Sequence, residues 1–143
     1  MDQVAAAQNI LQQVMFVSSI MAGSALIIAA QLLLGGGEKT RVKSASIVLF
    51  LVAGMTMLVA LFKAAGENVA LSSLAFSASQ TPYAEALRGV KDALAGFIVP
   101  AWRLGLFTFM SGVAVIGWVY SRAVGLVGLA AAAAAVALML RRF

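Results

Sequence analysis

Residues 10–34, ILQQVMFVSSIMAGSALIIAAQLLL, and residues 45–62, ASIVLFLVAGMTMLVALF, decide the fold of this chain. Neither run contains a charged residue. Each comes close to the roughly 20 apolar residues with which an α-helix crosses the hydrocarbon core of a bilayer. Between the runs, Gly35-Gly36-Gly37 stops the first helix and the short basic segment EKTRVK follows. A connection this short makes the two spans antiparallel neighbours.

A second apolar stretch, residues 104–140, is too long for a single span, because a helix that rises about 1.5 Å per residue would overshoot the bilayer. Its most polar point is Tyr120-Ser121-Arg122, next to an interface-seeking Trp118. We therefore place a turn there. The expected third and fourth spans are about 104–119 and 123–140.

The connection between the second and third spans contains two different segments. Residues 66–80 are serine-rich and weakly apolar, and are typical either of a loop or of a shallow re-entrant turn. Residues 82–99 follow a Thr81-Pro82 helix start and repeat apolar residues at three- and four-residue steps. They predict an amphipathic helix lying at the membrane surface, which Pro100 bends or ends. The fold class is therefore all-α, a single integral membrane domain over residues 1–143 with about four spans and one interfacial helix.

Composition agrees with a membrane location and excludes many kinds of site. The chain is 63% hydrophobic and 10% charged, with a mean hydropathy of +1.02, so it lacks the polar side chains that cover a soluble domain. It has no cysteine and no histidine, which removes disulfides, Cys/His zinc sites, haem ligation and imidazole catalysis. We expect no cofactor, no metal and no enzymatic activity.

The charged residues of the chain lie outside the expected spans, apart from those at their ends. None of the five carboxylates is placed to carry a proton or cation through the membrane, which disfavours an ion-coupled transporter. The net charge of +5 comes from scattered bases, so we expect contacts with anionic phospholipids rather than nucleic acid. The residues expected at the interface, in contact with lipid or a partner, are Lys39, Arg41, Lys43, Arg88, Lys91, Trp102 and Arg103.

Two features bear on orientation and oppose each other. The compact cluster Lys39, Arg41 and Lys43 draws the first loop into the cytoplasm. The full count of bases on each side favours the opposite orientation, with both termini in the cytoplasm, by a small margin. The topology stays open, with a slight preference for the second arrangement in a bacterial inner membrane. At the end of the second span, Lys63 either pairs with Glu67 or extends its amine to the headgroups.

Small residues at four-residue spacing give the clearest packing signal. In lipid, such pairs let helix backbones approach closely. The expected packing residues are Ser19 with Gly23, Ala25 with Ala29, and Gly128 with Ala132. These surfaces fit contacts within the chain and contacts with other membrane subunits or copies of itself equally well.

Two classes of function follow. We favour a non-catalytic structural or accessory subunit of a larger membrane assembly; the alternative is a small homo-oligomeric channel or transporter. Residues 10–62, with the Gly35-Gly36-Gly37 stop, the basic loop and the second apolar run, also resemble the conjugative pilins of type IV secretion. That resemblance implies a self-assembling secretion component. The two further expected spans of this chain lie outside the resembling region and depart from the pilin pattern.

Overall fold

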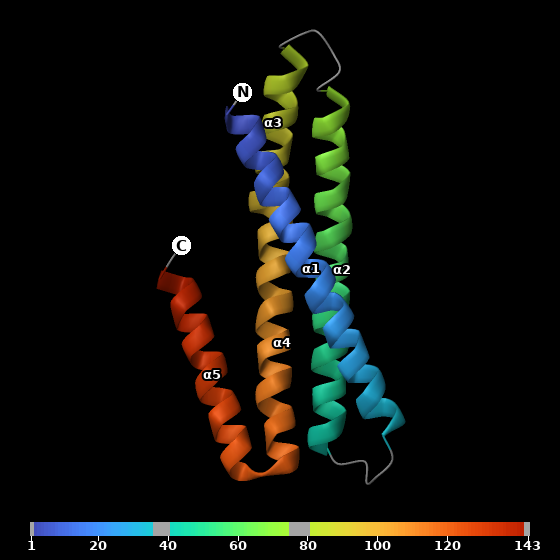
Figure 1. The fold of residues 1–143 in the computed structure, drawn as a ribbon, viewed down its shortest axis with the longest axis vertical. Coiled ribbons are helices and arrows are strands. Elements are labelled where there is room, and N and C mark those ends of the chain that lie inside the picture. The colour runs from blue at the N-terminus through green and yellow to red at the C-terminus, as the bar shows by residue number, and fades with distance from the viewer. Residues whose placement is uncertain (1, 36–40, 75–80, 142–143) are drawn as a thin grey trace.

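The computed structural model describes residues 2–35, 41–74 and 81–141, and these residues are helical almost throughout. The elements are α1 (Asp2–Leu34), α2 (Arg41–Leu74), α3 (Thr81–Ala93), a five-residue π-helix η1 (Leu94–Ile98), α4 (Val99–Tyr120) and α5 (Arg122–Arg141). Because α3, η1 and α4 follow each other without a break, they form one rod, and the described chain has four helical rods (Figure 1).

Three of these rods are long and apolar enough to cross a membrane: Val4–Leu34, Arg41–Ser73 and Ala84–Trp118. The chain is therefore a multi-pass membrane protein by its composition and helix lengths. The rods run antiparallel, with α1 packed on α2, α2 on α4, and α4 on α5. In Figure 1, α1 crosses in front of its neighbours, and α5 leans outward and ends well below the top of the α3–α4 rod.

The helices begin and end differently from the sequence prediction in three places. The first helix starts at Asp2 rather than near residue 10, and the second continues to Leu74 rather than ending near residue 62. The first part of the expected loop or re-entrant turn, residues 66–74, is thus ordinary α-helix; the remainder, 75–80, lies outside the described residues. Alanine and other good helix formers in this region extend the helix beyond its most apolar part.

The third difference concerns the amphipathic segment 82–99, which does not end at Pro100 or lie across the bundle. A π turn precedes the proline, with the amide of Val99 donating to the carbonyl of Leu94. Proline lacks an amide hydrogen and its ring crowds the preceding turn, and a locally wider turn accommodates it without ending the helix. The segment therefore continues into α4 and stands alongside α1 and α2 (Figure 1).

The turn between α4 and α5 lies at the expected polar point. Ser121 is extended, with φ −166° and ψ 158°, and separates the two helices. Its hydroxyl accepts a hydrogen bond from the amide of Val124 at 3.2 Å, which caps the start of α5. Gly117 and Gly125 meet on either side of the turn, where a Cβ on Gly117 would lie 2.9 Å from the Cα of Gly125. The close return of the chain therefore depends on these two glycines.

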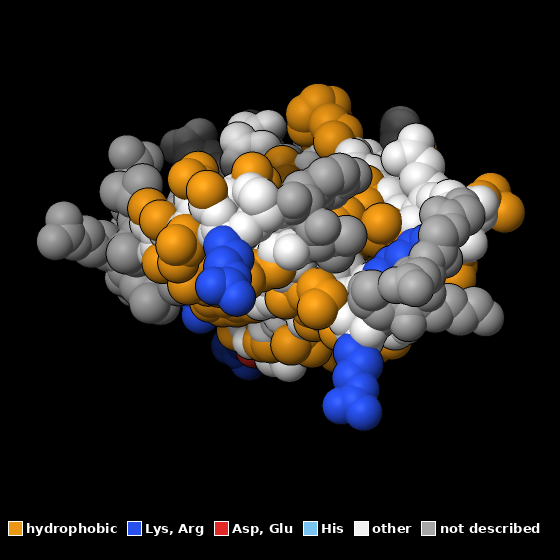
Figure 2. Space-filling model, turned by 90° about the horizontal axis from the view of Figure 1, so that it is seen from below, with side chains coloured by type: hydrophobic (Ala, Val, Ile, Leu, Met, Phe, Trp, Pro, Cys, Tyr) orange, Lys and Arg blue, Asp and Glu red, His pale blue; other side chains and the backbone are white. Residues whose placement is uncertain are grey.

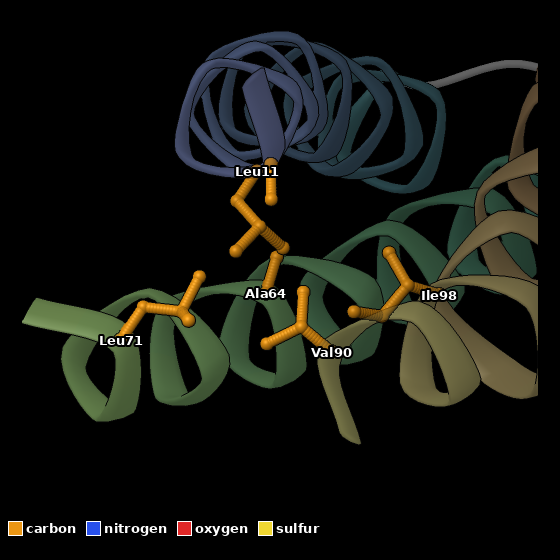
Figure 3. Packing of buried hydrophobic residues seen from close by; sticks show 6 residues of the cluster. Leu11, Ala64, Leu71, Val90 and Ile98 are labelled. Carbon is orange, nitrogen blue, oxygen red and sulfur yellow. The ribbon is translucent and has the colours of Figure 1, made fainter. Parts of the chain in front are cut away.

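The upper half of the bundle in Figure 1 comprises residues 2–14, 64–74 and 81–98, and the lower half comprises residues 15–34, 41–63 and 99–141. Figure 3 shows the core of the upper half, where Leu11 of α1 reaches toward Ala64 of α2. The buried residues of this upper core are Ala7, Leu11, Ala64, Leu71, Val90 and Ile98. The apolar face of the amphipathic segment is thus used for packing against helices.

The core of the lower half is built mainly from small residues around a few larger ones. Ala25 and Ala29 of α1 pack with Phe50 and Ala53 of α2. The Phe50 ring meets Phe109 of α4 edge to face, with ring centroids 5.6 Å apart. This aromatic pair joins the two central rods, α2 and α4, in the lower half.

Candidate functional site

Small residues on α1 form two separate faces. Ala25 and Ala29 are fully buried against α2. Ser19 and Gly23 are exposed, and a Cβ built on Gly23 would have no atom within 4 Å. The first pair therefore makes a contact within the chain, whereas the second leaves room for another helix to approach.

The predicted small pair on α5 is described only in part. Gly128 is half-buried next to α4, and a Cβ there would lie 3.4 Å from the Cα of Ala114. Ala132 lies within α5, but its side chain is outside the part of the chain that the structure describes. Elsewhere α5 is open: among the described helices it contacts α4 alone.

Two glycines that the sequence analysis did not single out bring α4 close to α2. A Cβ on Gly105 would lie 2.9 Å from side-chain atoms of Met57 and Thr56, and one on Gly112 would lie 3.1 Å from the Phe50 ring. Their spacing of seven residues places both glycines on one face of the helix. That spacing is the signal in the sequence that could have identified this contact.

The lower end of the bundle is basic. Arg41 is exposed, and the Lys43 amine donates to the carbonyl oxygen of Gly35, which links the start of α2 to the end of α1. Lys39 lies outside the described residues. Figure 2, which looks onto this end, shows Lys and Arg side chains projecting between hydrophobic patches. The arrangement suits contacts with anionic groups at the membrane surface.

The outer face of α3 carries charges of both signs. Arg88 and Lys91 are exposed there, beside exposed Glu85 and Asp92. The opposite face is buried at Val90, which packs in the upper core. Because packing on one face orients the helix, the charged face points away from the bundle.

Charged and aromatic residues gather where the upper and lower halves meet. Lys63 and Glu67 form an ion pair of 2.9 Å between Nζ and Oε1, so the structure shows the first of the two alternatives for Lys63. Trp102 is half-buried and packs against the cluster of Ala22, Met57 and Leu106. Arg103 is exposed beside it.

Three buried polar side-chain atoms have no hydrogen-bond partner among the described residues. They are Ser18 Oγ, Asn68 Oδ1 and Trp102 Nε1. Ser18 is completely buried on α1, next to the exposed Ser19. A buried polar atom without a hydrogen-bond partner lowers stability by about 1–3 kcal/mol. A hydrogen bond to a water or to another polar group would remove this cost at each of the three atoms.

The features of this chain are exposed small, basic and mixed-charge surfaces. Within residues 2–35, 41–74 and 81–141, no group of three or more acidic, histidine or cysteine side chains is positioned to hold a metal ion. Comparison with protein-family models, with curated proteins and with solved structures gave no match for this chain.

Proposed function

We propose that this protein is a non-catalytic structural or accessory subunit of a larger protein assembly in a membrane, with the bacterial inner membrane as its expected location. In this proposal α5 is the fourth span. It has 20 residues, which match the thickness of a bilayer, and the residues between Arg122 and Arg141 carry no charge. The other members of the assembly are integral membrane subunits or further copies of the chain.

The one-sided packing of α1 carries this proposal. The helix uses its Ala25 and Ala29 face within the chain, while the Ser19 and Gly23 face stays open. In lipid, helices gain little by burying apolar surface and associate through close backbone contact, for which small residues are needed. An open small-residue face on a helix that already has its own partner is therefore suited to a helix from another subunit.

The charged outer face of α3 supports the same function at a different place. Arg88 and Lys91 stand on a helix whose other side is held by the upper core. A charged face on a supported helix gives orientation and specificity to a docking contact more than raw affinity. We assign this face to recognition of an acidic surface on a partner subunit.

The first experiment is purification of the tagged protein from its native membrane in a mild detergent, followed by size-exclusion light scattering and protein identification. Other membrane proteins that co-purify in constant proportion support the proposal. A pure homo-oligomer contradicts it and favours the self-assembling alternatives, a channel or a pilin-like component. Transport of a solute by the purified chain alone in liposomes would then identify the channel.

Two variants test the two surfaces. Gly23→Leu adds bulk to the open face of α1, and Gly66→Leu is its matched control, because a Cβ at either glycine meets no atom within 4 Å. We expect Gly23→Leu to release partners and Gly66→Leu to retain them, with both proteins inserted normally. Equal retention by both variants would overturn the role of the α1 face.

The α3 surface is tested by reversing Arg88 and Lys91 to Glu together. Reversal of Glu85 and Asp92 to Lys on the same helix is the control, since it perturbs the helix equally without removing the bases. We expect loss of partners only in the first variant, with membrane insertion unchanged. Unchanged assembly after both reversals would show that α3 does not dock a partner.

A further inference from the structure

Three of the four rods, α1, α2 and α3–α4, are longer than a bilayer requires. At about 1.5 Å per residue, α1 with 33 residues and α2 with 34 residues are each about 50 Å long, against a hydrocarbon core of about 30 Å. The α3–α4 rod is longer still, since it extends from Thr81 to Tyr120. Some part of each rod must therefore lie outside the hydrocarbon, or the rods must tilt strongly.

The contacts between α2 and α4 show which residues share a level along the bundle. Gly105 faces Met57 and Gly112 faces Phe50, so each step along α4 matches an equal step back along α2. Continued in both directions, this register puts Lys63 opposite the start of α4 and Lys43 opposite its end. In the same way, Gly117 beside Gly125 and Ala114 beside Gly128 put the end of α5 at the level of Trp102 along the bundle, although α5 leans away from α4 there.

This register collects basic and aromatic residues into two belts. The upper belt contains Phe62, Lys63, Phe97, Trp102 and Arg103. The lower belt contains Arg41, Lys43, Trp118 and Arg122. Phe62 and Phe97 are large apolar side chains that stay exposed, at 71% and 45%. Trp together with Lys and Arg is typical of the boundary between hydrocarbon and water, and the exposed phenylalanines suit its hydrocarbon side.

Three helices give the same separation between the belts. Lys43 and Lys63 lie on α2 about 30 Å apart along the axis. From Arg103 to the end of α4 is about 26 Å, and from Arg122 to Arg141 on α5 is about 28 Å. Each value matches the thickness of the hydrocarbon core of about 30 Å. The described residues between the belts on these helices carry no charge.

Above the upper belt, the composition of all three rods changes. The start of α1 contains five Asn and Gln residues, Gln3, Gln8, Asn9, Gln12 and Gln13. The end of α2 contains Glu67 and Asn68, and α3 carries its charged outer face. If the α3–α4 rod were centred on the bilayer, Lys91, Asp92 and Arg103 would lie in hydrocarbon. Insertion of a charged side chain near the bilayer centre costs about 2.5–3.5 kcal/mol.

We propose that the bilayer surrounds only the lower half of the bundle, and that the upper half stands in water as a three-helix headpiece on the side that carries the N-terminal end of α1. The two belts lie at the two membrane–water interfaces, with Lys63 and Arg103 at the phosphate groups of anionic phospholipids. The upper core of Leu11, Leu71, Val90 and Ile98 is then the hydrophobic core of a small water-exposed domain.

The depth of Trp102 distinguishes this placement from a centred one. Residue 102 lies close to the middle of the α3–α4 rod, so a centred rod puts its indole near the bilayer midplane, whereas the proposal puts it at the interface. Trp118→Phe leaves Trp102 as the one tryptophan of the chain. In phosphatidylcholine–phosphatidylglycerol vesicles, we expect lipids brominated near the headgroup to quench its fluorescence more than lipids brominated near the chain ends. The reverse order would overturn the proposal.

Cysteine labelling gives a second measurement that does not depend on tryptophan. The chain has no cysteine, so single-cysteine variants need no other change. Val69→Cys lies in the upper half and Val52→Cys in the lower half of the same helix, and both positions are exposed, at 67% and 41%. A charged maleimide, present on both sides of the vesicle membrane, should modify Val69→Cys and leave Val52→Cys unmodified.

Detergent denaturation before labelling controls for the reactivity of each thiol, and both variants should then react fully. Gly89→Cys on α3 and Val113→Cys on α4 repeat the comparison on the other long rod, so a variant that fails to fold does not decide the result. Protection of Val69→Cys and Gly89→Cys in vesicles would show that the upper half is embedded and would overturn the proposal.

Discussion

The upper and lower cores of this bundle are built from different residues. In the upper core, four of the six buried residues are larger aliphatics, Leu11, Leu71, Val90 and Ile98, and the other two are alanines. Alanines dominate the lower core and its neighbouring cluster, and Gly105 and Gly112 add close approaches between α2 and α4. The outer surfaces differ as well: exposed charges surround the upper core together with a few exposed apolar side chains, Ile10, Val69 and Phe97, whereas most exposed large apolar side chains lie around the lower core.

The difference reflects the solvent that drives each core to form. In water, burial of a large apolar side chain is favourable by about 1.5–3 kcal/mol, so a small helical core uses leucine, isoleucine and valine. In lipid the same burial gains little, and helices are held by van der Waals contact that small residues bring about. The composition of a helical core therefore indicates whether water or lipid surrounds it.

The largest expected effect comes from truncating one side chain in each core. Leu71 and Met57 are both completely buried and similar in size. Leu71→Ala should lower the free energy of unfolding by about 2–5 kcal/mol, because it loses transfer from water and leaves a cavity. Met57→Ala should lower the free energy of unfolding by about 2 kcal/mol less than Leu71→Ala does. The reason is that the Met57 side chain is buried from lipid rather than from water, so its truncation loses little transfer free energy. Unfolding with sodium dodecyl sulfate in mixed micelles measures both, and equal losses would contradict two different solvents.

Glycine substitutions should give smaller effects of opposite sign. A Cβ at Gly112 would lie 3.1 Å from the Phe50 ring, which is fully buried and packed edge to face on Phe109 and so has little room to move. Gly112→Ala should therefore destabilise the lower half by about 1–3 kcal/mol, reduced by a gain of up to about 1 kcal/mol in helix propensity. Gly23→Ala meets no atom within 4 Å and should stabilise the isolated chain by up to about 1 kcal/mol. The same unfolding titration compares the two variants. A stabilised Gly112→Ala protein would show that the Phe50 ring is not held tightly against α4.

The ion pair between Lys63 and Glu67 should have the smallest effect. Lys63 is 48% exposed at its side chain and the pair lies one helical turn apart, so Glu67→Gln should cost about 0.3–0.5 kcal/mol, and less at high salt. If this level of the bundle lay in hydrocarbon, loss of the partner would instead cost about 3–5 kcal/mol. Unfolding at low and high ionic strength distinguishes the two values, with Glu85→Gln on the exposed face of α3 as control.

Much of the helical pattern could be predicted from the sequence, since it depends on neighbours along the chain. The two antiparallel apolar helices, the turn at Ser121 and the amphipathic face at Val90 and Ile98 follow from local hydropathy and polarity. The direction of the amphipathic segment could not be predicted in this way. A helix with one apolar face can bury that face equally well in a membrane surface or against other helices.

The candidate surfaces divide in the same manner. The small pairs on α1 were visible in the sequence, but only the structure shows that Ala25 and Ala29 are used within the chain and that the Gly23 face is open. Gly105 and Gly112 gain their importance from Met57 and Phe50, which lie far away in sequence. Spacing marks a face, and the partner of that face is a long-range property.

Hydropathy, charge and helix-breaking residues act over a few turns of the chain, and they are enough to predict an all-helical, multi-pass membrane protein. That residues 81–120 form one rod, with its upper part packed along α1 and α2, follows from contacts between segments far apart in the chain. That arrangement depends on the packing of Val90 and Ile98 in one buried cluster with Leu11 and Leu71. Such a choice is made by complementary packing between distant segments, which local pattern does not encode.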